Sequence, residues 1–222
     1  MSAKGHAYYV TDPMCSWCWG FSPVIESIRD EYRDRADFTL VVGGLRVGTK
    51  DIMTDSVRDT VVHHWKEVNK QTGQPFNFDF NVPEDFVYDT EPACRAVVAV
   101  RELDDTLVFD YLREVHRAFY LNSRNVVDTE VLSNIAVDAG IARSDFLTRF
   151  EAADTRQKTL DDFAQALEWG IRGFPSVVLQ ERDRLRLLTV GYQGLESLRP
   201  LLDRWLETLE HTADTNESPA ES

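Results

Sequence analysis

The sequence predicts an α/β fold with a single sheet, in which a long helical insertion separates the first two strands from the last two. Two short apolar runs of strand length lie near each end of the chain, and residues 51–170 have helical spacing almost throughout. A third observation is the motif Cys15-Ser16-Trp17-Cys18, placed between the first apolar run and the first helical pattern. Because two strands alone are rarely stable, we expect the four strands to share one sheet, in the order β-α-β, insertion, β-β-α.

The first unit is a predicted β-α-β unit. Residues 7–11 form an apolar run typical of a strand, and residues 38–42 form a second run that ends at two glycines. Between them, apolar residues at helical spacing predict a helix over residues 15–33: Phe21, Ile25, Ile28 and Tyr32. The two strands should therefore be parallel and joined by a right-handed crossover.

The insertion is predicted to consist of several amphipathic helices that pack over the sheet near the cysteines. Asp128 has the position of an N-cap, and Gly140 that of a helix stop. An aromatic segment interrupts the helical pattern and receives no assignment: Phe76, Phe78, Phe80, Phe86 and Tyr88. We expect these rings to belong to the core rather than to a ligand pocket, and substrate to bind between insertion and sheet.

The last part of the chain is a predicted hairpin followed by a helix. Residues 177–179 and 185–190 are strand-like and close in sequence, so they should pair antiparallel. An amphipathic helix follows from residue 195. The predicted organisation is thus one α/β domain from residues 6–50 and 171–210, a helical subdomain over 51–170, and a flexible acidic tail over 211–222.

The composition of the 222-residue chain narrows the class of function. A formal net charge of −14 disfavours nucleic acid and anionic membranes as partners. No apolar run reaches the ~18 residues that span a bilayer, and the N-terminus has no apolar signal region. Three cysteines are an odd number, which argues against a disulfide framework. We expect a cytoplasmic protein, either a monomer or a homodimer.

The two cysteines of the motif predict dithiol chemistry. Cys15 should lie at the start of a helix, where free N–H groups and the helix dipole stabilise a thiolate. Cys18, one turn later, could then resolve a mixed disulfide formed at Cys15. A zinc site is the alternative, but it normally needs four ligands and the chain has no second Cys or Cys/His pair. We expect no metal and no tightly bound cofactor.

With these features the chain resembles the DsbA-like group of the thioredoxin fold, which carries a helical insertion. Pro23 matches the proline that kinks the active-site helix of thioredoxins, and Gly173-Phe174-Pro175 matches their cis-proline loop. The stretch from residue 118 to 128 resembles a narrower branch, the predicted cytoplasmic disulfide isomerases, the FrnE-like proteins and the 2-hydroxychromene-2-carboxylate isomerases. The resemblance covers residues 6–210. It implies that Pro175 is cis beside the cysteines and that the Phe174 backbone pairs with substrate.

One residue departs from the family pattern. The buried acid that thioredoxin and DsbA proteins carry six residues before the first cysteine is Tyr9 in this chain. Asp12 is a candidate for taking over proton handling for Cys18. Trp17, between the two cysteines, is a candidate substrate contact. Cys94 lies among small apolar residues, so we expect it to be a buried core residue.

The leading interpretation is a thiol–disulfide oxidoreductase of the reductase or isomerase type, acting on protein or small-molecule thiols and disulfides. Glutathione is a candidate co-substrate. Two other classes stay open: a glutathione-dependent isomerase or transferase for a small aromatic substrate, and a redox-independent chaperone. The presence of Cys18 argues against the glutathione-dependent isomerase or transferase, because that chemistry needs no resolving thiol.

Overall fold

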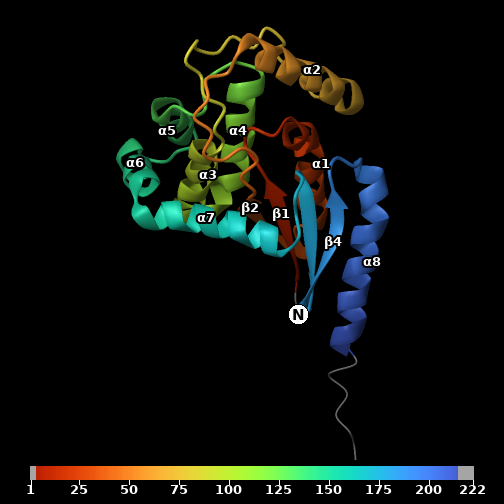
Figure 1. Ribbon diagram of the computed structural model, residues 1–222. Helices are drawn as coiled ribbons and strands as arrows, with labels where there is room; N and C mark the ends of the chain where they lie inside the picture. The colour runs from red at the N-terminus through yellow and green to blue at the C-terminus, as the bar shows by residue number, and fades with distance from the viewer. Residues whose placement is uncertain (1–3, 215–222) are drawn as a thin grey trace, which may run out of the picture.

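A four-stranded mixed sheet lies at the centre of the molecule, with helices on both of its faces (Figure 1). The structure is a computed structural model that describes residues 4–214. The strand order is β2-β1-β3-β4, with parallel pairing of β1 and β2 and antiparallel pairing of the rest. The strands are β1 (Gly5–Thr11), β2 (Ala36–Val42), β3 (Ser176–Glu181) and β4 (Arg184–Val190). The predicted α/β fold with one shared sheet is therefore confirmed.

Alternation along the strands gives the sheet two apolar faces. Ala7 and Tyr9 of β1 belong to the main core with α1 (Ser16–Tyr32) and α8 (Leu195–Asp214). Val10, Val41 and Val178 point to the other face, toward the end of α7 (Ala153–Glu168). Successive strand residues point to opposite faces, so Tyr9 and Thr11 share the face that α1 covers. Figure 1 shows α8 alongside β4.

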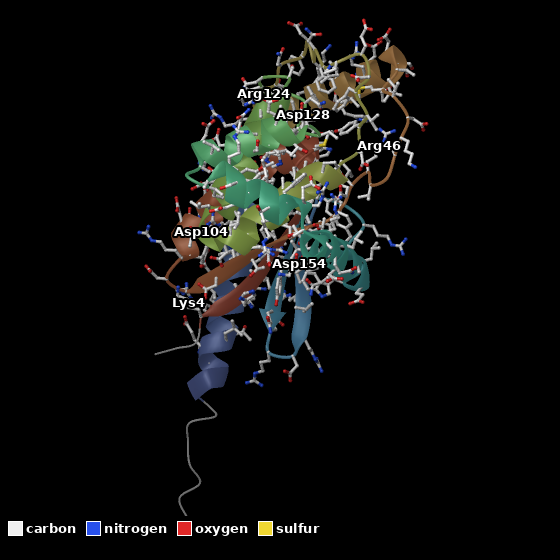
Figure 2. The ribbon with its side chains drawn as sticks, turned by 90° about the vertical axis from the view of Figure 1, so that its left-hand side faces the viewer. Lys4, Arg46, Asp104, Arg124, Asp128 and Asp154 are labelled. Atoms are coloured by element: carbon white, nitrogen blue, oxygen red, sulfur yellow. The ribbon has the colours of Figure 1, made fainter. Side chains whose placement is uncertain are left out.

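The insertion is helical, as predicted. Before α7 it contains α2 (Asp55–Thr72), α3 (Glu91–Leu103), a short 3-10 turn η1 (Asp105–Leu107), α4 (Val108–Tyr120), α5 (Thr129–Asp138) and α6 (Arg143–Glu151). Asp128, labelled in Figure 2, caps α5 by accepting a hydrogen bond from the Glu130 N–H at 2.8 Å. Whether residues 51–170 form a separate subdomain stays a prediction.

The unassigned aromatic segment lies between α2 and α3 and has mixed burial. Its only pairing among the described residues is an isolated bridge between Ile52 and Val87. Phe80 is fully buried, with its ring centroid 4.4 Å from that of Trp65 of α2 and 5.3 Å from that of Phe119 of α4. The segment thus joins two helices through ring packing, which periodicity cannot reveal.

A buried ion pair joins the insertion to the sheet. Arg101 of α3 donates to both carboxylate oxygens of Asp162 of α7, at 2.8 and 3.0 Å. The same guanidinium donates to the Leu40 carbonyl of β2, and Asp162 accepts from the Val42 N–H. Three elements distant in sequence are therefore fixed by one charged pair.

The end of the chain differs from the prediction. Helix α8 continues to Asp214, so residues 211–214 are helical where a tail was predicted from residue 211. The spacing of large apolar residues ends near Leu209, whereas helix formation needs no apolar residue in its last turn. Residues 215–222 of the predicted tail lie outside the described residues. Over residues 4–214, no helix combines the length and apolarity that a membrane crossing requires.

Candidate active site

Cys15 lies at the junction between β1 and α1, directly before the first helical residue. It is the N-cap of α1 and has an extended backbone, with φ −91° and ψ 114°. Its N–H donates to the Asp12 carbonyl at 3.1 Å, and its own carbonyl accepts from the Cys18 N–H at 3.0 Å. The first N–H groups of a helix have no intrahelical acceptor, and the dipole is positive there. Cys15 therefore lies at the positive end of the α1 dipole, beside N–H groups that have no intrahelical acceptor.

Cys18 lies one turn further into the helix and is fully buried. Burial, and secondarily the neighbouring Cys15, raise the pKa of the Cys18 thiol well above its ordinary value, while the Thr11 hydroxyl opposes this. Cys15, Cys18 and Cys94 are all free thiols. The two cysteines of the motif are therefore unequal: Cys15 is at the surface of the site, with 5% of its area exposed, and Cys18 lies behind it.

The loop before β3, the strand that pairs with β1, lies beside Cys15. The Cys15 thiol lies 3.7 Å from the Phe174 carbonyl, which accepts its hydrogen bond, and the Phe174–Pro175 peptide bond is cis. The Phe174 ring packs over Gly43, where a Cβ atom would overlap it. The glycine pair that ends β2 therefore makes the space for the ring beside the cysteine.

A hollow of about 390 Å³ opens over Cys15. Its walls come from the motif, the loop after β2, helix α2, the aromatic segment and the loop before β3: Met14, Cys15, Ser16, Trp17, Leu45, Val61, His64, Trp65, Tyr88, Gly173 and Phe174. Of the residues named from the sequence, Cys15, Trp17 and Phe174 line this hollow. Cys18, Asp12 and Pro175 are buried behind it.

Helix α2 contributes walls that the sequence did not predict, and Tyr88, which was predicted to be a core ring, also lines the hollow. His64 of α2 received no role from the sequence. Its spacing of three residues from Val61 was the available signal, because residues three apart share a helix face. Tyr88 has two roles: it lines the hollow, and its hydroxyl donates to the Met14 carbonyl at 2.7 Å. Among residues 4–214 there is no cluster of three or more metal-ligating side chains.

Asp12 is fully buried and organises the loop that carries Cys15. One carboxylate oxygen accepts from the Met14 N–H at 2.8 Å, and the other accepts from the Leu45 N–H at 2.7 Å and from the Cys94 thiol at 3.4 Å. Burial raises the pKa of the Asp12 carboxyl, and the two N–H donors partly oppose this. Cys94 is a buried residue of α3, as expected, and it is also a donor to this carboxylate.

Comparison with known proteins identifies the family. The DSBA-like thioredoxin domain matches residues 9–203 as a family model. The chain belongs to this family. Its DsbA-like members are thiol–disulfide oxidoreductases, which agrees with the unequal dithiol at the start of α1.

Two solved structures extend over almost the whole of this DSBA-like chain. A "putative protein disulfide isomerase" from Nitrosomonas europaea is 42% identical, with a TM-score of 0.87 over 93% of this chain and 99% of that chain. The cytosolic disulfide reductase DsbM from Pseudomonas aeruginosa is 26% identical, with a TM-score of 0.76 over 91% and 99%. DsbM has also been solved with GSH, and that structure is 25% identical with a TM-score of 0.74.

A curated relative matches only part of this chain. The ClpXP adapter protein SpxH from Halalkalibacterium halodurans is 23% identical over 146 residues, which are 63% of this chain. The aligned part is 46% of that protein, so the chain spans about half the length of the curated relative it matches.

Proposed function

We propose that this protein reduces or isomerises disulfides by dithiol exchange through Cys15 and Cys18. The observation that carries the proposal is the inequality of the pair. Cys15 lines the hollow at a helix N-terminus and contacts the Phe174 carbonyl, whereas Cys18 is fully buried one turn behind it. A nucleophile that faces substrate and a resolving thiol behind it are the two parts that this exchange requires.

The exchange proceeds in two balanced steps. The Cys15 thiolate attacks one sulfur of a substrate disulfide, so that a Cys15–substrate disulfide forms while the substrate S–S bond breaks and one thiolate leaves and takes up a proton. Cys18 then loses its proton and attacks the Cys15 sulfur. The Cys15–Cys18 disulfide forms, and the second substrate thiolate leaves. The substrate has gained two electrons, which a thiol reductant must return to the pair.

We infer that this reductant is a small thiol such as glutathione, in the cytoplasm. DsbM, a cytosolic disulfide reductase, supports the compartment and the direction, and its structure with GSH supports the co-substrate. The hollow of about 390 Å³ beside Cys15 has room for a small thiol or a segment of polypeptide. The partners are thus protein or small-molecule thiols and disulfides, and the proposed assembly is a monomer or a homodimer.

Reduction of insulin disulfides by glutathione tests the proposal. We expect the wild-type protein to accelerate it, Cys15→Ser to abolish the acceleration, and Cys18→Ser to accumulate a mixed disulfide visible by mass spectrometry. Cys94→Ser is the matched control, because it replaces the remaining cysteine and keeps a donor to Asp12; it should retain activity. Equal rates for wild type and Cys15→Ser would overturn the proposal.

A second candidate is a glutathione-dependent isomerase or transferase for a small aromatic substrate. The observation in its favour is the aromatic lining of the hollow, to which Trp17, Trp65 and Tyr88 contribute. Such chemistry needs Cys15 alone. Full turnover of an aromatic substrate by Cys18→Ala would support this candidate, and loss of that turnover would favour dithiol exchange.

A further inference from the structure

We propose that the hydroxyls of Tyr9 and Thr11 carry the proton that Cys18 loses during resolution into a narrow cavity between α1 and α4. This inference rests on the proposed dithiol exchange and concerns its second step. It gives a role to Tyr9, an enclosed hydroxyl beneath Cys18.

Tyr9 and Thr11 form a pair of hydroxyls beneath Cys18. They are two residues apart on β1, so both side chains point to the face that α1 covers. The Thr11 hydroxyl donates to the Tyr9 hydroxyl at 3.2 Å, and both interact with the Cys18 thiol. Thr11 is fully buried and Tyr9 is 1% exposed. The Cys18 thiol therefore meets these hydroxyls on its inner side, away from bulk water.

The Asp12 carboxylate near the site is already engaged. Both carboxylate oxygens of Asp12 accept hydrogen bonds from Met14, Leu45 and Cys94, so this carboxylate organises the loop before Cys15. Cys18 has no exposed surface from which a proton could pass directly to solvent. The path that we propose for its proton therefore begins at Thr11 and Tyr9, the hydroxyls that interact with the Cys18 thiol.

The cavity provides the continuation of that path. Its volume is about 20 Å³, and one water needs roughly 10–15 Å³ on this measure. It extends from the buried residues Tyr9 and His116 to the half-buried Glu26 and the exposed Asp110. A water in it can accept a proton from the Tyr9 hydroxyl and pass it toward the charged residues at the opening.

The transfer is balanced without a charged tyrosine. The Cys18 proton moves to the Tyr9 oxygen, directly or through Thr11, as the Tyr9 hydroxyl gives its own proton to the water. The Cys18 thiolate then attacks the Cys15 sulfur, and the leaving substrate thiolate takes up a proton from solvent. Burial raises the pKa of Tyr9 well above its ordinary value, which agrees with a hydroxyl that exchanges protons without remaining ionised.

The titratable and charged groups around this path come from three elements and the loop after β1. The path is faced by Tyr9 from β1, Asp12 and Cys15 from the loop, Cys18, Glu26 and Arg29 from α1, and Asp110, Arg113 and His116 from α4. Burial lowers the pKa of His116 to about 4, so its ring is neutral near pH 7 and adds no charge to the path.

A two-phase reaction with a chromogenic aryl disulfide separates the two steps. The reduced protein releases one aryl thiolate when Cys15 attacks and a second when Cys18 resolves the mixed disulfide. Cys18→Ser should release only the first aryl thiolate. That result would also show that buried Cys94 does not react with the aryl disulfide. For Tyr9→Phe we expect an unchanged first phase and a second phase slower by roughly tenfold or more. The second phase of the variant should also depend more steeply on pH than that of wild type.

Matched variants distinguish proton transfer from packing. Tyr111→Phe also removes a fully buried hydroxyl, one that donates to the Leu132 carbonyl away from Cys18, and it should leave both phases unchanged. Thr11→Ser should keep a faster second phase than Thr11→Val because it keeps the hydroxyl. A second phase in Tyr9→Phe with wild-type rate and pH dependence would overturn the relay. Absence of both phases in wild type would instead overturn the proposed exchange.

Discussion

Gly43 controls the position of Phe174, and through it the wall of the site beside Cys15. The Phe174 ring occupies the place that a Cβ atom at residue 43 would need. The Phe174 carbonyl in turn accepts the hydrogen bond of the Cys15 thiol. The absence of a Cβ atom at Gly43 therefore affects the geometry around Cys15 through the position of Phe174.

We expect Gly43→Ala to displace Phe174, to slow the reaction of Cys15 and to lower the free energy of unfolding by about 1–3 kcal/mol, as overpacking does. The measurements are the first phase of aryl thiolate release and urea unfolding. Gly194→Ala is the matched control, since no atom lies within 4 Å of its added Cβ. An unchanged first phase in Gly43→Ala would show that the Phe174 position does not matter to Cys15.

His116 is a neutral, fully enclosed histidine behind the motif. Its Nε2 lies 3.5 Å from the Asp12 carbonyl, and its Nδ1 lies 3.4 Å from the Ser22 hydroxyl. A carbonyl can only accept, so Nε2 carries the proton. Burial lowers the pKa of His116 from 6.5 to about 4, which means that folding opposes protonation of this ring.

The stability of the protein should therefore fall on acidification through this range. Between pH 6.5 and pH 4 the unfolded chain binds the His116 proton more strongly than the folded one does. The contribution of neutral His116 to the free energy of unfolding is fully present above pH 6.5. About 3 kcal/mol of it is lost as the pH falls to about 4. His116→Gln should show a correspondingly smaller loss in urea unfolding at a series of pH values. Parallel curves for the two proteins would contradict the assignment.

At the residue scale, sequence reasoning found the reactive groups and missed those that support them. Cys15, Trp17 and Phe174 line the hollow, and their positions follow from the motif and the loop that matches it. Thr11 received no role, because its contact with Cys18 depends on which face of β1 the helix covers. The contact between Cys94 and Asp12 joins residues 82 positions apart, which no local pattern can predict.

At the scale of elements, the Arg101–Asp162 pair determines how the insertion meets the sheet. Two hydrogen bonds join Arg101 of α3 to Asp162 of α7, and two more join this pair to the backbone of β2. Both side chains are largely buried, with 17% and 10% of their areas exposed. Removing one partner therefore leaves the other as an uncompensated charge in the interior.

We expect Asp162→Leu to lower the free energy of unfolding by about 3–5 kcal/mol, because the Arg101 guanidinium remains buried without its partner. Arg101→Met should be costly for the same reason. The double variant Arg101→Met/Asp162→Leu should cost clearly less than the sum of the two. A double-mutant cycle in urea measures this, and additive losses would show that the pair is not coupled.

Periodicity predicted the order and type of most elements, but not the residues at which they begin and end. The predicted strand at residues 7–11 begins at Gly5, and the one at 38–42 begins at Ala36. Segment 73–90 could not be assigned because its order comes from ring contacts with α2 and α4, such as that between Trp65 and Phe80. Strand alternation and helix spacing report local burial, whereas such contacts depend on the assembled fold.

At the scale of the whole molecule, net charge selects among substrates. The formal charge is −14, and like charge lowers the rate at which an anion approaches. The Debye length is about 8 Å at physiological ionic strength and about 30 Å at 0.01 M, so this repulsion should be strongest in dilute salt.

We therefore expect the cationic disulfide cystamine to react faster relative to the anionic glutathione disulfide as salt is lowered. The ratio of their second-order rate constants should rise from about 0.15 M to about 0.01 M salt. Hydroxyethyl disulfide, which is uncharged, is the control and should change little. A ratio that does not depend on salt would show that the net charge of the whole chain does not govern how charged disulfides approach Cys15.

The separation of Cys15 from Phe174 by 159 positions has a consequence for biosynthesis. Cys15 and Cys18 leave the ribosome early, whereas β3, the second neighbour of β1 in the sheet, follows only after the entire insertion. At about 5–20 residues per second, the delay is on the order of ten seconds. During that time the nascent chain exposes thiols that the finished protein encloses, so its own cysteines need a reducing environment before they can act on those of other proteins.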